Sequence, residues 1–207
     1  MMSRSNEGRG PLYRVYINRL RRSLDPDSVP KHVAMMIDGN RRWARQLGFD
    51  SPADGHRAGA AKMREFLEWC DEVGVQVVPL YLRSNDNVTK RDSREIADLI
   101  EIIAELADEL SRYRDWKVQH VGSTAGLPDG LVAVLDAAQE RTKHNPGMHV
   151  NLAVGYGGRR EIVDAVRSII VAYDQEGGSL EELAASLTPE TIGEHLYTGG
   201  QPDPDLV

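Results

Sequence analysis

Short apolar runs alternate with longer amphipathic stretches along this chain, and this alternation limits its fold more than any other feature of the sequence. The apolar runs predict strands at residues 33–37, 75–82, 116–121 and 149–154, and the amphipathic stretches predict helices at residues 11–24, 55–73, 93–113, 129–143 and 159–174. Strands and helices in this order are typical of a mainly parallel central sheet flanked by helices. We therefore expect a single α/β domain over residues 31–207, preceded by a tail and short helix over residues 1–30.

The basic helix expected at residues 11–24 has two interpretations. It carries Leu12, Val15, Tyr16 and Leu20 near helical spacing, followed by a short basic run. Packing on the surface of the domain is the favoured interpretation, and contact with a membrane is the alternative.

The composition excludes several classes of protein. The 207 residues include 25 Lys and Arg against 32 Asp and Glu, a net charge of 25 − 32 = −7, so we expect no nucleic-acid partner, because such partners require a basic face. Cys70 is the single cysteine, which excludes an intramolecular disulfide. No apolar run approaches the roughly 20 residues that span a bilayer, and residues 1–9 lack the apolar stretch of a secretory signal. We expect a cytoplasmic protein without stable membrane insertion.

The stretch Asp38-Gly39-Asn40-Arg41-Arg42-Trp43 directly follows the first predicted strand. Ligands of parallel sheets bind at the carboxyl ends of strands. A carboxylate there can hold Mg²⁺, a glycine lets the backbone approach a ligand, and arginines match phosphate oxygens. The stretch therefore indicates a diphosphate site with Mg²⁺ on Asp38. The alternative is an ordinary turn with two solvated arginines, and the residues alone weigh the two about equally.

Two further polar segments bear on the same site. Gly55-His56-Arg57-Ala58-Gly59 opens the second predicted helix, whose positive end suits a phosphate, and Arg64 lies two turns further on. Ser84-Asn85-Asp86-Asn87 follows the second predicted strand and offers hydroxyl, amide and carboxylate groups. Solvated surface residues and a plain turn are the alternatives for these two segments.

Several blocks of the sequence resemble the cis-prenyltransferases, the Z-type prenyl diphosphate synthases that include undecaprenyl diphosphate synthase. The blocks are residues 32–44 (HVAMMIDGNRRWA), 55–59 (GHRAG), 81–87 (YLRSNDN), 154–161 (VGYGGRRE) and 197–207 (YTGGQPDPDLV), and they occur in the family's order. The resemblance implies an α/β domain whose sheet and helices enclose a hydrophobic tunnel. Its candidate walls are Ala60, Met63, Leu67, Ile100 and Ile103, although an ordinary helix core would contain the same residues.

The resemblance also implies roles for individual residues. Asp38 would bind Mg²⁺ and help to ionise an allylic prenyl diphosphate, and Ser84 and Asn87 would assist removal of the proton after the carbon–carbon bond forms. The candidate substrate-binding residues are Gly39, Asn40, Arg41, Arg42, Trp43, His56, Arg57, Arg64, Asn85 and Lys90. Relatives usually form dimers, so a homodimer is expected.

The sequence departs from the family pattern at places that bear on the reaction, including Lys90, where an Arg is common, and Asp50-Ser51-Pro52, where many relatives carry a phosphate-binding Arg. The family usually has Ser-Thr-Glu-Asn-Trp where this chain has Ser84-Asn85-Asp86-Asn87-Val88, and the chain lacks the family's usual C-terminal segment, which grips isopentenyl diphosphate. Our main interpretation is therefore irregular, head-to-middle coupling of dimethylallyl or geranyl diphosphate to a second C5 diphosphate, giving a branched, lavandulyl-type product. The alternatives are a regular short-chain Z-synthase of the Z,E-farnesyl type and a non-catalytic partner subunit.

Overall fold

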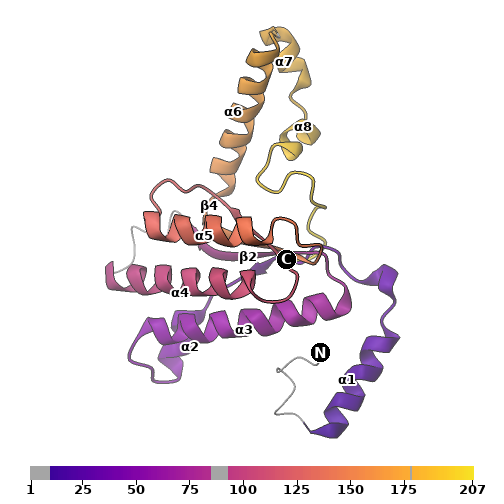
Figure 1. Ribbon diagram of the computed structural model, residues 1–207, viewed down its shortest axis with the longest axis vertical. Coiled ribbons are helices and arrows are strands. Elements are labelled where there is room, and N and C mark those ends of the chain that lie inside the picture. Colours follow the sequence, from indigo (N-terminus) through magenta and orange to yellow (C-terminus); the bar gives the residue numbers. More distant parts are fainter. Residues whose placement is uncertain (1–9, 85–92, 178) are drawn as a thin grey trace.

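In the part of the chain that the computed structural model describes, residues 10–84, 93–177 and 179–207, a four-stranded sheet forms the centre of the fold (Figure 1). The strands are β1 (Met35–Met36), β2 (Val77–Ser84), β3 (Lys117–Val121) and β4 (His149–Tyr156), in the order β1-β2-β4-β3. The paired strands are parallel, and Leu80 of β2 lies opposite both Met35 of β1 and Leu152 of β4. The predicted α/β domain with a parallel sheet is confirmed.

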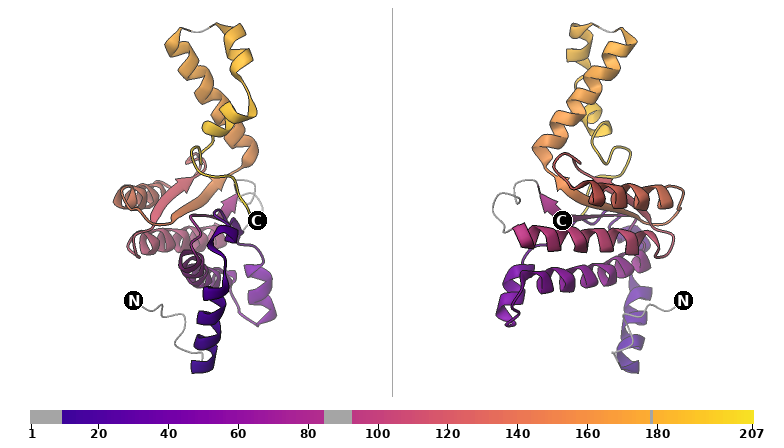
Figure 2. Two further views of the ribbon diagram at one scale, coloured as in Figure 1. Left: turned by 90° about the vertical axis from the view of Figure 1, so that its right-hand side faces the viewer. Right: turned by 60° about the vertical axis from the view of Figure 1, so that its left-hand side comes forward.

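The helices form one layer over the sheet and two extensions from it (Figures 1 and 2). The layer contains α3 (Pro52–Val73), α4 (Ser93–Ser111) and α5 (Asp129–Thr142), and α2 (Asn40–Gln46) packs on α3. The extension after β4 contains α6 (Gly158–Glu176), α7 (Leu180–Ser186) and α8 (Pro189–Glu194), and the one before the sheet contains α1 (Pro11–Ser23) and the 3-10 turn η2 (Pro26–Ser28).

The core lies between the sheet and the helix layer. Leu99, Ile103, Leu106 and Leu110 of α4, three or four residues apart, are all buried, as the periodicity of residues 93–113 predicts. Trp116, at the start of β3, is fully buried in the same core. This packing holds the strands in register, so their carboxyl ends lie at one edge of the sheet.

The strand predicted at residues 33–37 is too long. β1 contains only Met35 and Met36, and Val33 forms an isolated bridge with Leu206 instead. Met36 is 66% exposed, because β1 is at one edge of the described sheet rather than between two strands. Helices α7 and α8 were not predicted, although Ser179 and Thr188 cap their first turns with side-chain hydrogen bonds.

Helix α3 begins and ends where its sequence supplies caps. The Ser51 side chain accepts the Ala53 N–H at 3.2 Å, and Pro52 occupies the first turn. Gly74 ends the helix in the left-handed conformation, with φ of 93°. The helix therefore starts three residues before the predicted boundary, and His56 lies in its first turns beside α2.

Helices α1 and α6 extend from the body toward opposite ends of the molecule (Figure 2). We expected the helix at residues 11–24 to pack on the domain surface. This expectation is wrong for the apolar side of the helix, because Leu12 is 85% exposed. Among the described residues, we find no helix with the length and apolar character needed to cross a membrane.

Candidate active site

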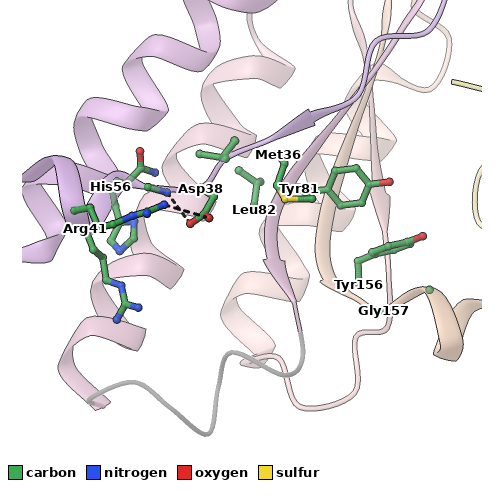
Figure 3. A pocket seen from close by; sticks show the side chains of 13 residues that line it. Met36, Asp38, Arg41, His56, Tyr81, Leu82, Tyr156 and Gly157 are labelled. Atoms are coloured by element: carbon green, nitrogen blue, oxygen red, sulfur yellow. Dashed lines mark hydrogen bonds and ion pairs between the residues drawn. The ribbon is translucent and has the colours of Figure 1, made fainter. Parts of the chain in front are cut away.

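A pocket of about 730 Å³ opens at the carboxyl ends of β1, β2 and β4 (Figure 3). Asp38, Arg41 and His56 lie on one side of it, Tyr81 and Tyr156 lie on the other, and Leu82 lies between them. Its lining residues are Met36, Ile37, Asp38, Gly39, Asn40, Arg41, Arg42, His56, Tyr81, Leu82, Tyr156, Gly157 and Gly158. The pocket therefore brings together residues of four blocks that are separate in the sequence, 32–44, 55–59, 81–87 and 154–161.

Asp38 presents an open carboxylate to this pocket. One oxygen accepts the Gly39 N–H at 2.6 Å, and the other lies 3.9 Å from the Arg42 guanidinium. The side chain is 81% exposed, so most of its oxygen lone pairs remain available to a ligand. Gly39 adopts the left-handed conformation, with φ of 93°, which turns the chain into α2 immediately after the carboxylate.

The start of α2 sits directly against α3 because two glycines leave room for it. A Cβ on Gly55 would lie 2.4 Å from the Asn40 carbonyl oxygen, and one on Gly59 would lie 2.7 Å from the Asn40 side-chain amide. These glycines are one helical turn apart and face the same neighbour. The GHRAG block therefore fixes the position of Asn40 and of the arginines that follow it.

A buried carboxylate from α4 connects Arg41 with His56. One oxygen of Glu95 lies 3.4 Å from His56 Nε2, and the other lies 3.7 Å from Arg41 Nη1. His56 and Glu95 are both largely buried, whereas about half of the Arg41 side chain is exposed. Glu95 therefore orients both groups from behind while Arg41 reaches toward the pocket.

Two tyrosines form the opposite wall. The rings of Tyr81 and Tyr156 meet edge to face with centroids 5.3 Å apart, and the Tyr156 hydroxyl donates to buried Glu161 at 2.7 Å. Burial raises the pKa of Tyr156, and its hydrogen bond to Glu161 raises it further, so this hydroxyl stays protonated at neutral pH. Gly157 and Gly158, at the start of α6, complete this wall.

A small apolar cavity of about 40 Å³ continues from the pocket between α3 and α4. It shares Ile37, Asn40, His56 and Leu82 with the pocket and adds Ala60, Leu99, Ile102, Ile103 and Leu106. Of the five predicted walls, Ala60 and Ile103 line this space, whereas Met63 and Leu67 are buried in the core and Ile100 packs against the core. The helical period alone could not separate these two groups.

Several sequence-predicted residues lie away from the pocket or outside the described residues. The Trp43 ring stacks on Phe49 at 5.7 Å, the Arg57 guanidinium pairs with Glu101 at 3.7 Å, and Arg64 pairs with Glu109. None of these three lines the described pocket. Asn85, Asn87 and Lys90 lie outside the described residues, as does the side chain of Ser84.

The candidate site residues predicted from the sequence do not include Glu95 or seven residues that line the pocket: Met36, Ile37, Tyr81, Leu82, Tyr156, Gly157 and Gly158. Glu95 gives no local signal, since it is one acidic residue among many on α4. Tyr156-Gly157-Gly158 does carry one, because polar and glycine residues that end a buried strand mark a ligand edge in parallel sheets.

The donor set at Asp38 fits a hard divalent cation. A single carboxylate that is exposed to a polar pocket suits Mg²⁺, which prefers oxygen ligands and completes its shell with water and substrate phosphates. The guanidiniums of Arg41 and Arg42 lie beside the same position. The side chains present therefore match a metal-bound diphosphate better than a free metal ion.

The fold and the pocket define a class of protein. Its members are parallel α/β proteins with carboxylate, amide and guanidinium groups at the strand ends, beside an apolar cavity. Residues 36–207 match the family model described as "Putative undecaprenyl diphosphate synthase". The chain belongs to this family of cis-prenyltransferases and is a transferase of prenyl groups. The family uses a divalent metal ion.

Individual relatives give a more specific comparison than the family model does. A (2Z,6E)-farnesyl diphosphate synthase of Thermobifida fusca is 51% identical over 197 residues, covering 95% of this chain and 77% of the relative. The enzyme of the same name from Mycobacterium tuberculosis is 46% identical over 200 residues, covering 95% and 76%. Lavandulyl diphosphate synthase from Lavandula x intermedia, solved with dimethylallyl diphosphate, is 29% identical, with a TM-score of 0.75 over 86% of this chain and 76% of that one.

Proposed function

We propose that this chain is a regular short-chain Z-prenyl diphosphate synthase that condenses an allylic diphosphate, such as geranyl diphosphate, with isopentenyl diphosphate. The observation that carries the proposal is the Asp38–Arg42 loop, which faces a pocket continuous with an apolar cavity between α3 and α4. Such a site accommodates a diphosphate head and an apolar tail together. The small size of the inner cavity favours a short product.

The reaction requires the bond between C1 and oxygen of the allylic substrate to break, with its electron pair leaving on diphosphate. The double bond of isopentenyl diphosphate then forms the new carbon–carbon bond at C1, and loss of a proton restores a double bond. Fixed positive charge that is already in place stabilises the leaving diphosphate. Arg41 and Arg42 supply that charge, and the Gly39 backbone allows close approach of the phosphates.

Asp38 is the proposed ligand of Mg²⁺. The ion, when bound, neutralises charge that develops on the leaving diphosphate. Asp38 holds its position through the Gly39 N–H, and His56 and Asn40 support the phosphates from α3 and α2. Ser84 and Asn87 remain the proposed residues for proton removal.

Our main interpretation from the sequence is irregular coupling. The comparisons support the alternative, a regular short-chain Z-synthase, better than that interpretation. Relatives at 46–51% identity carry the name (2Z,6E)-farnesyl diphosphate synthase, whereas the lavandulyl enzyme is 29% identical. The likeness in fold to a structure that holds dimethylallyl diphosphate keeps head-to-middle coupling as the second candidate.

A product assay with the purified chain separates these functions. Geranyl diphosphate with labelled isopentenyl diphosphate and Mg²⁺ should give linear Z-farnesyl diphosphate, and omission of isopentenyl diphosphate should abolish product. A branched product from dimethylallyl diphosphate alone would establish irregular coupling instead. Absence of product in every mixture, from protein shown to be folded by circular dichroism, would favour a non-catalytic subunit.

A further inference from the structure

Helix α1 exposes a continuous apolar face. Leu12, Tyr16 and Leu20 are spaced four residues apart, so they lie on one stripe of the helix. All three are exposed, and so is Val15 on the flank of this stripe. Within the described chain, this face remains open to solvent, which is unfavourable for a stripe of large apolar side chains.

The opposite side of α1 is the one that contacts the body. Arg21 pairs with the Glu72 carboxylate at 3.2 Å and donates to the Glu72 carbonyl oxygen at 3.2 Å. Asn18 and Arg21 line a groove of about 440 Å³ together with Glu72 and Val73 of α3. These contacts hold α1 with its polar side toward the body, and Figure 1 shows the helix extending beyond the domain.

Charge is divided unequally between this end of the chain and the rest. Residues 1–24 contain six Arg and one Glu, a net charge of 6 − 1 = +5. Because the whole chain carries −7, residues 25–207 carry −7 − 5 = −12. An anionic surface would therefore attract the α1 end and repel the remainder, which orients the molecule with α1 toward that surface.

We propose that α1 is an interfacial anchor that binds the surface of an anionic lipid bilayer. Leu12, Tyr16 and Leu20 enter the headgroup region, and Arg19, which is exposed on the flank of the stripe, meets lipid phosphates. An apolar stripe that includes a tyrosine and has an arginine beside it, in a helix without any acidic residue, matches the chemistry of a lipid interface. The binding is peripheral and independent of the proposed reaction.

Vesicle flotation of the full chain tests this proposal. The wild-type protein should float with vesicles of phosphatidylcholine and phosphatidylglycerol, should not float with phosphatidylcholine alone, and should be released by high salt. The double variant Leu12→Ser/Leu20→Ser should bind at least about tenfold more weakly. Leu180→Ser is the matched control, because Leu180 on α7 is 82% exposed, much like Leu12.

Three results of the flotation assay would overturn the anchor, and so would one result without lipid. One is a wild-type protein that stays in the soluble fraction with both vesicles, and another is equal flotation on both. The third is a double variant that floats like the wild type while circular dichroism shows that both are folded. If the double variant instead changes the sedimentation coefficient of the protein without lipid, the apolar face contacts a second copy, and the proposal is wrong.

Discussion

Asp38 is the residue on which the proposed reaction depends most, and its exposure makes its contribution easy to separate from stability. Asp38→Ala should lower kcat/KM by at least about 100-fold. Without this carboxylate the proposed metal ion loses its protein ligand, and the charge of the leaving diphosphate is no longer neutralised. The free energy of unfolding should stay within about 0.5 kcal/mol of the wild-type value, since the side chain is 81% exposed. Steady-state kinetics and urea denaturation measure the two effects. Asp136→Ala, at an exposed position of α5, is the control and should change neither.

Leu82 is one of four residues that line both the pocket and the inner apolar cavity. Leu82→Ala should lengthen the product by at least one isoprene unit, because removal of its branched end enlarges the passage between the two spaces. Chromatography of dephosphorylated products measures the length. Met36→Ala, at a position that lines the pocket alone, should keep the wild-type length. An unchanged product from Leu82→Ala would mean that the chain grows elsewhere.

At the scale of single residues, the sequence could predict what lies next to a strand end and little beyond it. Asp38, Arg41 and Arg42 follow one another, so a local pattern was enough to place them in one pocket. Glu95 reaches His56 from a different helix, and no local pattern encodes that contact. Arg57 and Arg64 share the helix of His56, but both pair with acidic residues of α4 instead.

The contact between α2 and α3 is an element-scale feature that depends on Gly55. Gly55→Ala should destabilise the protein by about 1–3 kcal/mol, because its Cβ would meet the Asn40 carbonyl and force the backbone to shift. Activity should fall as well, since Asn40 begins α2 and directly precedes Arg41 and Arg42. Urea denaturation measures the first effect. Gly130→Ala is the matched control: nothing lies near its Cβ in α5, so this change should stabilise the protein by about 0.4–1 kcal/mol. Equal effects of the two substitutions would refute the close approach.

The segment before Leu206 is tied to the start of the domain through Asp205. Its carboxylate accepts the Lys31 N–H at 2.7 Å and the His32 N–H at 3.0 Å, and these bonds lower the pKa of Asp205. A lowered folded-state pKa contributes stability above the unfolded value of about 3.9 and loses it as pH falls through the folded value. Asp205→Ala should therefore be less stable than wild type at pH 7, and the difference should shrink below about pH 4. Thermal unfolding across pH measures this difference. A difference that does not change with pH would mean that these two hydrogen bonds are not its cause.

For the whole molecule, the order of the four strands and the longer helices was predictable because each of them carries its own hydrophobic period. The length of β1 was not, since an apolar run of five residues looks the same at the edge of a sheet as at its centre. Helices α1 and α6 project from the body because of contacts that they do not make with it. The amphipathic period of a helix gives no information on such missing contacts. The sequence therefore predicts the central layers better than the extensions.

Helix α6 provides the last prediction, which concerns the assembly of the molecule. Val163 and Ile170 lie two turns apart on one stripe of α6, and Ile162 and Val171 flank it; all four are exposed. Unlike α1, this helix carries both acidic and basic side chains, so we expect a second copy of the chain to cover its apolar stripe. The wild-type protein should sediment as a dimer at micromolar concentration, and Val163→Asp/Ile170→Asp should sediment as a monomer. Leu12→Ser/Leu20→Ser is the control and should remain dimeric. A monomeric wild-type protein, or a dimeric α6 variant, would exclude α6 as the interface.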